Sequence, residues 1–277
     1  MPWPYGWPST VANRLPPDPM SEPDLPAMTT NPESPPQLEP FPEDWERALA
    51  VVAHPDDMEY GTSSAVARWT AQGKSVAYCL VTSGEAGIDG LDPEQAGPVR
   101  KEEQRAACAA VGVRELEFLG FPDGVLEYGL PMRRAIAAVI RRHRPEVVIT
   151  GNFRDTFGPG ALNMADHIVT GQATLDAARD AGNRWVFRDL LSEGLEPWNG
   201  VRLVAAGGSP QATHAVDIGE YFDVGVESLK AHRAYLEAFG DNAPDPEEML
   251  EGFARMAGAQ LGVRLATSFE VYPLRFL

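Results

Sequence analysis

Short apolar runs alternate with longer amphipathic segments from about residue 45 onward. The runs are rich in Val, Ile, Leu and Phe, which is typical of strands buried on both faces of a parallel sheet. They span residues 48–53, 75–82, 115–119, 146–150 and 202–206. The helix-like segments between them cover residues 62–72, 99–111, 131–142 and 165–181. This alternation predicts βαβ units and a mostly parallel sheet, so the expected fold class is α/β.

The order of elements changes after residue 207. The pattern there predicts a short strand over 213–216, helices near 223–239 and 246–259, and a last strand over 269–272. We expect this last third to wrap the sheet and to close one side of the site.

The first 44 residues have a different composition. They hold 13 of the 25 prolines, mixed with Ser, Glu, Asp and Asn, and such a segment cannot bury enough apolar surface to offset its ordering entropy. We therefore predict a disordered tail over residues 1–44 and one folded domain over residues 45–277. The aromatic start of the tail fits a docking peptide, and it fits equally a stretch upstream of a later start codon.

Charge and cysteine content narrow the class of protein. The net charge of −17 argues against nucleic acid and anionic membrane as partners, because both attract basic surfaces. Cys79 and Cys108 lie in a strand-like and a helix-like run, so we expect two core thiols and a reducing compartment. No apolar run is long enough to cross a membrane and no export signal precedes the domain. A soluble, cytoplasmic protein is expected.

The segment His54-Pro55-Asp56-Asp57 directly follows the apolar run 49–53. It places an imidazole and two carboxylates at the carboxyl end of a strand, where open α/β sheets keep their chemistry. Imidazole and carboxylate are good ligands for a zinc-like ion, and a second carboxylate can take a proton from an attacking water. Taken alone, the segment fits an ordinary turn equally well.

A second polar cluster, Asp166-His167, follows the loop 158–163. Two such clusters at strand-to-helix junctions are what a catalytic metal site with three protein ligands requires. A dinucleotide-binding site would instead need a glycine fingerprint after the first strand, and two carboxylates there would repel a pyrophosphate. The pattern therefore predicts a metal-dependent hydrolase.

These motifs resemble those of the LmbE-like, or PIG-L, family of zinc-dependent N-deacetylases. The first family motif corresponds to residues 53–57 and the second to Asp166-His167. The resemblance extends from about Ala48 to the C-terminus and includes residues 82–85, Arg100 and residues 120–124. It implies a Rossmann-like three-layer sandwich and makes residues 45–277 the catalytic domain.

The resemblance also implies roles for single residues. His54, Asp57 and His167 would hold zinc, while Asp56 would act as the general base. Ferrous iron suits the same ligands. Asp166 is the natural partner to fix the orientation of an active-site histidine.

The resemblance implies that Arg100 and Asp123 contact the substrate's polar groups. Arg100 has an alternative interpretation as a solvated residue in the first turn of the helix over 99–111. That position is unfavourable for a cation without a partner.

The chain departs from the family at Met164, where many members have a histidine thought to stabilise the oxyanion. Methionine cannot donate that hydrogen bond. Asn163 and His214 are the candidates to replace it, and we favour His214 as a catalytic residue because an imidazole can also protonate a leaving group. A structural role for His214 remains the alternative.

Three further residues are expected to play no part in the chemistry. His143 follows two arginines at a helix end, where positive charge suits the helix dipole. His232 is expected at the surface, and Glu59 is not assigned to the metal.

The function expected from the residues and the resemblance is hydrolysis of an amide. We expect a zinc amidohydrolase that removes an acetyl or other acyl group from an N-acylated amino sugar or a related small conjugate. The alternatives are an amidase for a thiol-sugar conjugate and a metal-binding homologue without catalysis. A homo-oligomer fits the family, although no segment indicates an interface.

Overall fold

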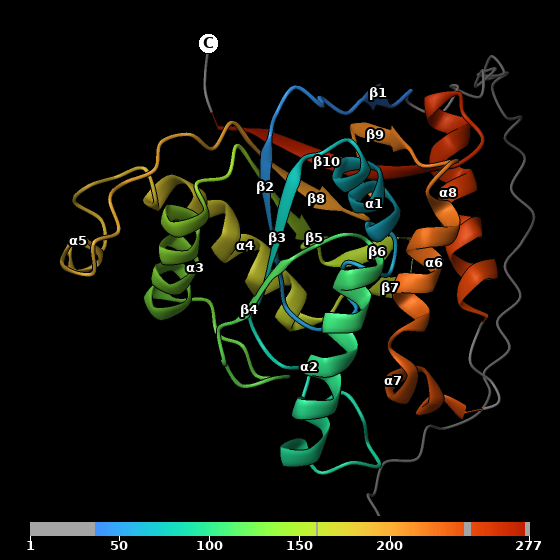
Figure 1. The fold of residues 1–277 in the computed structure, drawn as a ribbon, viewed down its shortest axis with the longest axis horizontal. Helices are drawn as coiled ribbons and strands as arrows, with labels where there is room; N and C mark the ends of the chain where they lie inside the picture. The colour runs from blue at the N-terminus through green and yellow to red at the C-terminus, as the bar shows by residue number, and fades with distance from the viewer. Residues whose placement is uncertain (1–36, 159, 241–244, 275–277) are drawn as a thin grey trace, which may run out of the picture. The chain divides into compact units, whose positions relative to one another are not determined.

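The computed structural model describes residues 37–158, 160–240 and 245–274, and within them an eight-stranded sheet forms the centre of the molecule (Figure 1). The strands lie in the order β4-β3-β2-β5-β8-β10-β9-β1. Their bounds are β1 Glu39–Pro40, β2 Arg47–Val52, β3 Ser75–Leu80, β4 Glu115–Phe118, β5 Val147–Gly151, β8 Leu203–Gly207, β9 His214–Asp217 and β10 Ala266–Pro273. Five neighbouring strands, from β4 to β8, run parallel, and β10 is antiparallel to both β8 and β9. The predicted α/β class with a mostly parallel sheet is confirmed.

The chain order in the sheet creates a switch point between β2 and β5. From β2 the chain builds β3 and β4 on one side, and it then returns to build β5 and β8 on the other. Open α/β sheets form a crevice outside the carboxyl ends of the strands at such a point. The segment His54 to Asp57 directly follows β2 and therefore lies at this crevice.

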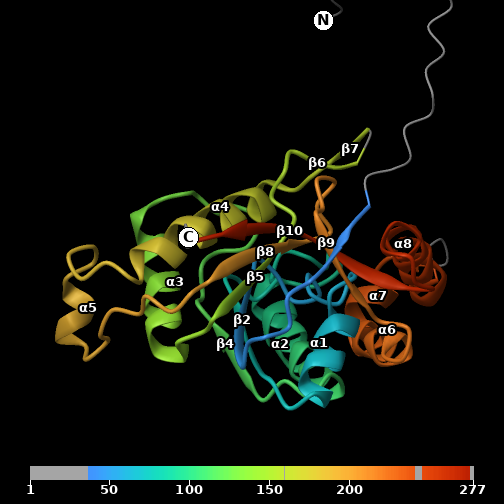
Figure 2. The same cartoon turned by 90° about the horizontal axis from the view of Figure 1, so that it is seen from above.

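Helices cover both faces of the sheet and give a three-layer sandwich (Figure 2). One face carries α1 Ser63–Ala71, α2 Pro93–Ala110, α6 Phe222–Lys230 and α8 Pro246–Leu261, and the other carries α3 Leu130–His143 and α4 Ala165–Asp180. Alternate residues of β2 serve the two cores, with Leu49 and Val51 packing toward α3 and α4. This explains why β2 is apolar from Ala48 to Val52, since both of its faces are buried there.

The predicted strands agree with the observed ones to within a few residues, but one helix boundary was wrong. Helix α2 begins at Pro93 rather than at 99. Asp92 caps it by accepting a hydrogen bond from the Glu94 N–H, Pro93 occupies the first turn, and the helix continues through Pro98. Arg100 therefore lies inside α2 and not in its first turn.

The sequence pattern did not predict several short elements. They are the hairpin of β6 Thr156–Gly158 and β7 Ala161–Leu162, the short helix α5 Asp189–Ser192, and strand β1. The predicted helix over 223–239 is two helices, because α6 ends before His232 and α7 spans Arg233–Glu237.

The predicted tail reaches residue 44, but residues 37–44 belong to the folded structure. Strand β1 pairs with β9, and Leu38 and Phe41 are buried. The Phe41 ring packs on Trp69 and Phe269, with ring centroids 5.5 and 5.1 Å away. The proline-rich composition of residues 1–44 gave no indication that these two apolar side chains are buried. The rest of the predicted tail, residues 1–36, lies outside the described residues.

Two further expectations concern the membrane and the cysteines. In the described parts of the chain, no helix combines the length and apolar character needed to cross a bilayer. Cys79 and Cys108 are both buried and unbonded, as predicted.

Candidate active site

Three side chains converge at the carboxyl end of β2, and we call them the front cluster: His54, Asp57 and His167. The Nδ1 atom of His54 lies 3.2 Å from Nε2 of His167 and 3.6 Å from Oδ1 of Asp57, and the last two atoms lie 3.1 Å apart. Ligands at about 2.1 Å from a tetrahedral zinc ion are about 3.4 Å from one another. The spacing of these three atoms therefore suits a small divalent cation.

The turn after β2 holds the first two members of the front cluster. Oδ2 of Asp57 accepts hydrogen bonds of 2.9 Å from the backbone N–H groups of Ala53 and His54. This leaves Oδ1 available at the point where the three side chains converge. Nε2 of His54 lies 3.0 Å from Oδ1 of Asp123 and 3.4 Å from Oδ2 of Asp166. These carboxylates favour a proton on Nε2, so the lone pair of Nδ1 faces the cluster.

Helix α4 supplies the third member, and Asn163 orients it. Oδ1 of Asn163 lies 3.0 Å from Nδ1 of His167 and accepts the Met164 N–H, while its Nδ2 donates to the carbonyls of Asn152 and Arg154. Both amide hydrogens are thus engaged, so Asn163 does not fit the role of oxyanion donor that the sequence left open for it. The sequence analysis missed its actual position, although a residue four positions before a helical ligand is a natural partner.

Asp166 lies against His54 rather than His167. Besides the contact with His54, its carboxylate accepts the backbone N–H groups of Gly124, at 2.8 Å, and Leu126, at 3.1 Å. It thereby ties the loop after β4 to the beginning of α4. The structure gives Asp166 the contact that its predicted orienting role requires.

Asp123 contacts protein atoms through both carboxylate oxygens. Oδ1 contacts His54 and the Thr82 hydroxyl, at 3.0 and 3.3 Å, and Oδ2 accepts the Ala86 N–H at 2.8 Å. The sequence prediction placed Asp123 on the substrate. In the structure it lies behind His54, because the loop after β4 folds back onto the loop after β3.

Arg100 is buried, so the alternative of a solvated residue in the first turn is wrong. It is 2% exposed, and its guanidinium lies 4.2 Å from the centroid of the Tyr235 ring. It donates to the Pro55 carbonyl at 2.6 Å, to Oδ2 of Asp56 at 2.9 Å and to the Gly84 carbonyl at 3.2 Å. Arg100 therefore grips the turn that carries Asp56. The last third of the chain encloses this side of the site through Tyr235.

The two adjacent aspartates have opposite electrostatic environments. Burial raises the pKa of Asp56 to about 7, with Arg100 opposing the rise and Asp57 adding to it. Burial also acts on Asp57, but His167 and His54 outweigh it and hold the pKa of Asp57 far below its usual range. A pair of carboxylates with separated pKa values is typical of a base beside a permanent anion.

His214 is not brought to the front cluster within one chain. Its Nδ1 lies 2.8 Å from the Thr213 hydroxyl and its Nε2 lies 3.7 Å from Glu39. Strand β9 is four strands from β2 in the sheet, roughly 19 Å at the usual strand spacing. Met164, which stands where the family has the histidine that His214 was predicted to replace, lies at the beginning of α4 and is half exposed.

A second polar group lies behind the turn, and we call it the rear cluster: Glu59, Gln104, Ser228 and His232. Glu59 lies 3.3 Å from Nε2 of Gln104 and from the Ser228 hydroxyl, and 3.5 Å from Nε2 of His232. His232 was predicted at the surface but is fully buried. The helix there breaks before His232, and this break turns the side chain inward between α2 and α6.

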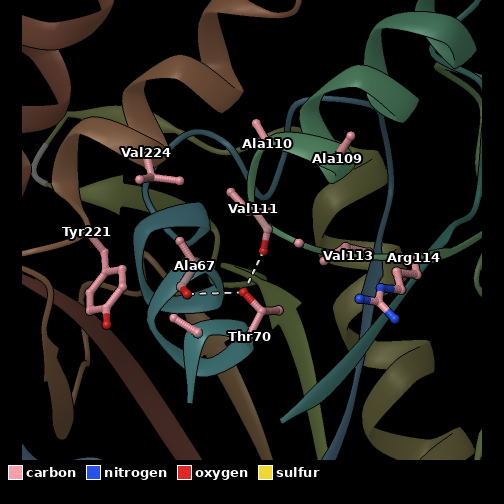
Figure 3. Close-up of a pocket in the computed structure, with 11 residues that line it drawn as sticks. Ala67, Thr70, Ala109, Ala110, Val111, Val113, Arg114, Tyr221 and Val224 are labelled. Atoms are coloured by element: carbon pink, nitrogen blue, oxygen red, sulfur yellow. Dashed lines mark hydrogen bonds between the residues drawn. The ribbon is translucent and has the colours of Figure 1, made fainter. Parts of the chain in front are cut away.

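An open pocket of about 670 Å³ lies away from these clusters, between α1, the end of α2 and α6 (Figure 3). The Thr70 hydroxyl is bonded to the carbonyls of Ala67 and Val111, and most of the described lining is apolar. None of the described lining residues belongs to the front cluster. The candidate site is therefore the front cluster, whose side chains could hold a metal ion.

Comparison with known proteins identifies similar proteins. The model of the PIG-L family, described as GlcNAc-PI de-N-acetylase, matches residues 49–178. A diacetylchitobiose deacetylase of Thermococcus kodakarensis is 29% identical over 247 residues, covering 86% of this chain and 87% of that protein. A probable N-acetyl-alpha-D-glucosaminyl L-malate deacetylase of Bacillus cereus is 30% identical over 197 residues, covering 69% and 84%.

A solved structure shares the fold. The N,N'-diacetylchitobiose deacetylase of Pyrococcus horikoshii superposes with a TM-score of 0.76 and 23% identity, covering 83% of this chain and 85% of that one.

Proposed function

The chain belongs to the PIG-L family and is a hydrolase of the deacetylase type, and from this premise we propose that it acts on amino sugars by a zinc-dependent mechanism built on the front cluster. Its substrate would be a small N-acetylated amino sugar or conjugate, and its products would be acetate and the free amine. The observation that carries the proposal is the convergence of one ligand atom each from His54, Asp57 and His167.

The front cluster would hold the metal. Two imidazoles and one carboxylate suit zinc, and they also suit ferrous iron. A divalent ion bound there would lower the pKa of water and polarise an amide carbonyl. In each of the three side chains, the polar atom that faces away from the metal position contacts another protein group. The ligands would therefore already be oriented before an ion arrives.

Asp56 would carry the proton. As a carboxylate it takes one proton from the attacking water, and it then gives that proton to the nitrogen of the breaking C–N bond. A pKa near 7 suits both steps, because the group must accept and release a proton at working pH. Asp123 and Asp166 would keep the proton of His54 on Nε2 and so hold the histidine in its ligand form.

The substrate class follows from the relatives' names and from charge. Two of the similar proteins are named for N-acetylglucosamine-containing small molecules, diacetylchitobiose and a glucosaminyl malate. The net charge of −17 disfavours nucleic acid and anionic lipid surfaces as substrates. The two free thiols support a cytosolic location.

The proposal assigns no residue as the oxyanion donor, which many family members have at position 164. His214→Ala tests the predicted substitute. Because His214 contacts Thr213 and Glu39 instead of the front cluster, we expect turnover to change by less than about twofold with full metal content. A much larger loss at full metal content would show that His214 does reach the substrate.

The decisive experiment measures metal content and acetate release from a panel of N-acetyl amino sugars and thiol-sugar conjugates. We compare the native chain, Asp56→Asn, and the exposed control Asp89→Asn. We expect Asp56→Asn to retain metal and lose about 100- to 10,000-fold in kcat, while the control keeps both. Native protein that binds zinc but releases no acyl group would contradict the proposal.

A further inference from the structure

We infer that Gln104 is a positioning residue that holds the general base in place through the backbone of Asp56. This inference rests on the proposed role of Asp56. Gln104 lies on α2, is 1% exposed, and its Oε1 accepts the Asp56 N–H at 3.0 Å. Among the described residues, its side chain contacts Asp56, Glu59 and Cys108 and no member of the front cluster, so it would act only through Asp56.

The backbone of Asp56 needs such support. Its φ is +84°, in the left-handed region that costs free energy for a residue with a Cβ atom. This conformation lets neighbouring side chains diverge, so that Asp56 meets Arg100 while Asp57 meets His54 and His167. A relaxed turn would move the base relative to the metal ligands.

The orientation of the Gln104 amide is determined by its two partners. A backbone N–H can only donate, so Oε1 faces Asp56. Nε2 lies 3.3 Å from both carboxylate oxygens of Glu59, which accept. Glu59 in turn accepts the Ser228 hydroxyl at 3.3 Å, and Nε2 of the buried His232 lies 3.5 Å from its carboxylate. The rear cluster therefore locks the amide in the one orientation that serves Asp56.

Arg100 and Gln104 lie on one helix, and both form hydrogen bonds with the turn at residues 55–56. They are four residues apart on α2, so their side chains leave the same face. Arg100 binds the Pro55 carbonyl and the Asp56 carboxylate, while Gln104 binds the Asp56 N–H. Arg100 brings a charge that also alters the pKa of Asp56. Gln104 is neutral, so its replacement tests position with little change of charge.

Gln104→Met is the first test, because methionine keeps the length of the side chain and removes the acceptor. We expect kcat to fall by about 10- to 100-fold, since small displacements of a catalytic group have effects of this size. KM and metal content should stay unchanged. The matched control is Gln95→Met on the exposed part of the same helix. If Gln104→Met does not fold, Gln104→Leu replaces it.

Hydrogen exchange supplies a readout independent of activity. Without its acceptor, the Asp56 amide should exchange at least about tenfold faster in the zinc-loaded protein, while the neighbouring amides bonded to Asp57 keep their rates. This measurement remains valid if the native chain proves inactive, so failure of the proposed function and failure of this inference are distinguishable.

A double-mutant cycle separates positioning from general damage. If Gln104 acts through the base, adding Gln104→Met to Asp56→Asn should lower the residual rate by less than about twofold. An unchanged kcat in Gln104→Met overturns the inference, and so does an unchanged Asp56 exchange rate. A full 10- to 100-fold further loss in the Asp56→Asn background overturns it as well.

Discussion

The front and rear clusters each combine histidine with a carboxylate and both include residues from the segment 54–59, yet only the front cluster has the arrangement of a metal site. In the front cluster, three ligand atoms lie 3.1 to 3.6 Å from one another. In the rear cluster, a single histidine nitrogen lies 3.5 Å from Glu59, and the other contacts of Glu59 come from an amide and a hydroxyl. Residue types alone therefore do not identify a metal site, whereas convergence of ligand atoms does.

The two clusters also differ in access. The His167 side chain is 16% exposed, whereas the side chains of His232 and Glu59 are both 0% exposed. The front cluster is therefore the more accessible of the two. This difference supports our proposals that the front cluster performs the chemistry and that the rear cluster supports the turn between them.

Removing a ligand from the front cluster should have the largest effect. For Asp57→Ala we expect loss of stoichiometric metal and a fall in kcat/KM of at least about 1,000-fold, because Lewis-acid stabilisation contributes several kcal/mol. Metal analysis after dialysis and acetate release measure both. Asp89→Ala, in an exposed loop, is the control. A variant with full metal and near-native turnover would remove Asp57 from the metal site.

A partner of a ligand should matter less than the ligand. For Asp166→Asn we expect zinc affinity to weaken by about 10- to 100-fold, because the contact with Nε2 of His54 loses its charge. Asp176→Asn changes the same side chain on the same helix, where Asp176 bonds to Tyr128 instead. Competition with a chelator gives both affinities. Equal affinities in the two variants would show that Asp166 does not orient His54.

The pH dependence should report Asp56. Because burial raises its pKa to about 7, the carboxylate form needed for catalysis is lost as the pH falls. At full metal occupancy, we expect kcat/KM to fall about tenfold per pH unit below 7. Arg100 lowers this pKa, so Arg100→Gln should move the acid limb to higher pH. A limb that stays in place would separate Arg100 from the base.

Breaking the rear cluster should leave the metal untouched. His232→Ala removes the buried partner of Glu59, and we expect the free energy of unfolding to fall by about 2 to 4 kcal/mol with unchanged zinc stoichiometry. Urea denaturation and metal analysis measure the two quantities. His143→Ala is the control, since His143 lies beside Glu117 at the end of α3 and is only partly buried. Loss of zinc in His232→Ala would contradict the separation of the clusters.

The apolar pattern predicted most of the fold, because strands buried on two faces must be apolar at every position. Strands β2 and β5 were found for this reason. The pattern did not predict the short elements, since β1 and the β6–β7 hairpin have only two or three residues in each strand and therefore show no periodicity. The predicted beginning of α2, at residue 99, was wrong, although Asp92 and Pro93 carry the start signals.

The sequence by itself determined the fold class, the family resemblance and the ligand candidates, because these depend on local pattern and on adjacency after a strand. Only the tertiary structure decided which polar groups meet. It brought His167 from α4 to His54 across more than a hundred residues, and it turned Arg100 and Asp123 inward onto protein partners. It also left His214 four strands away from β2. Contacts between segments that are distant in sequence depend on the order of the strands in the sheet and on the paths of the loops. Neither can be predicted from single residues.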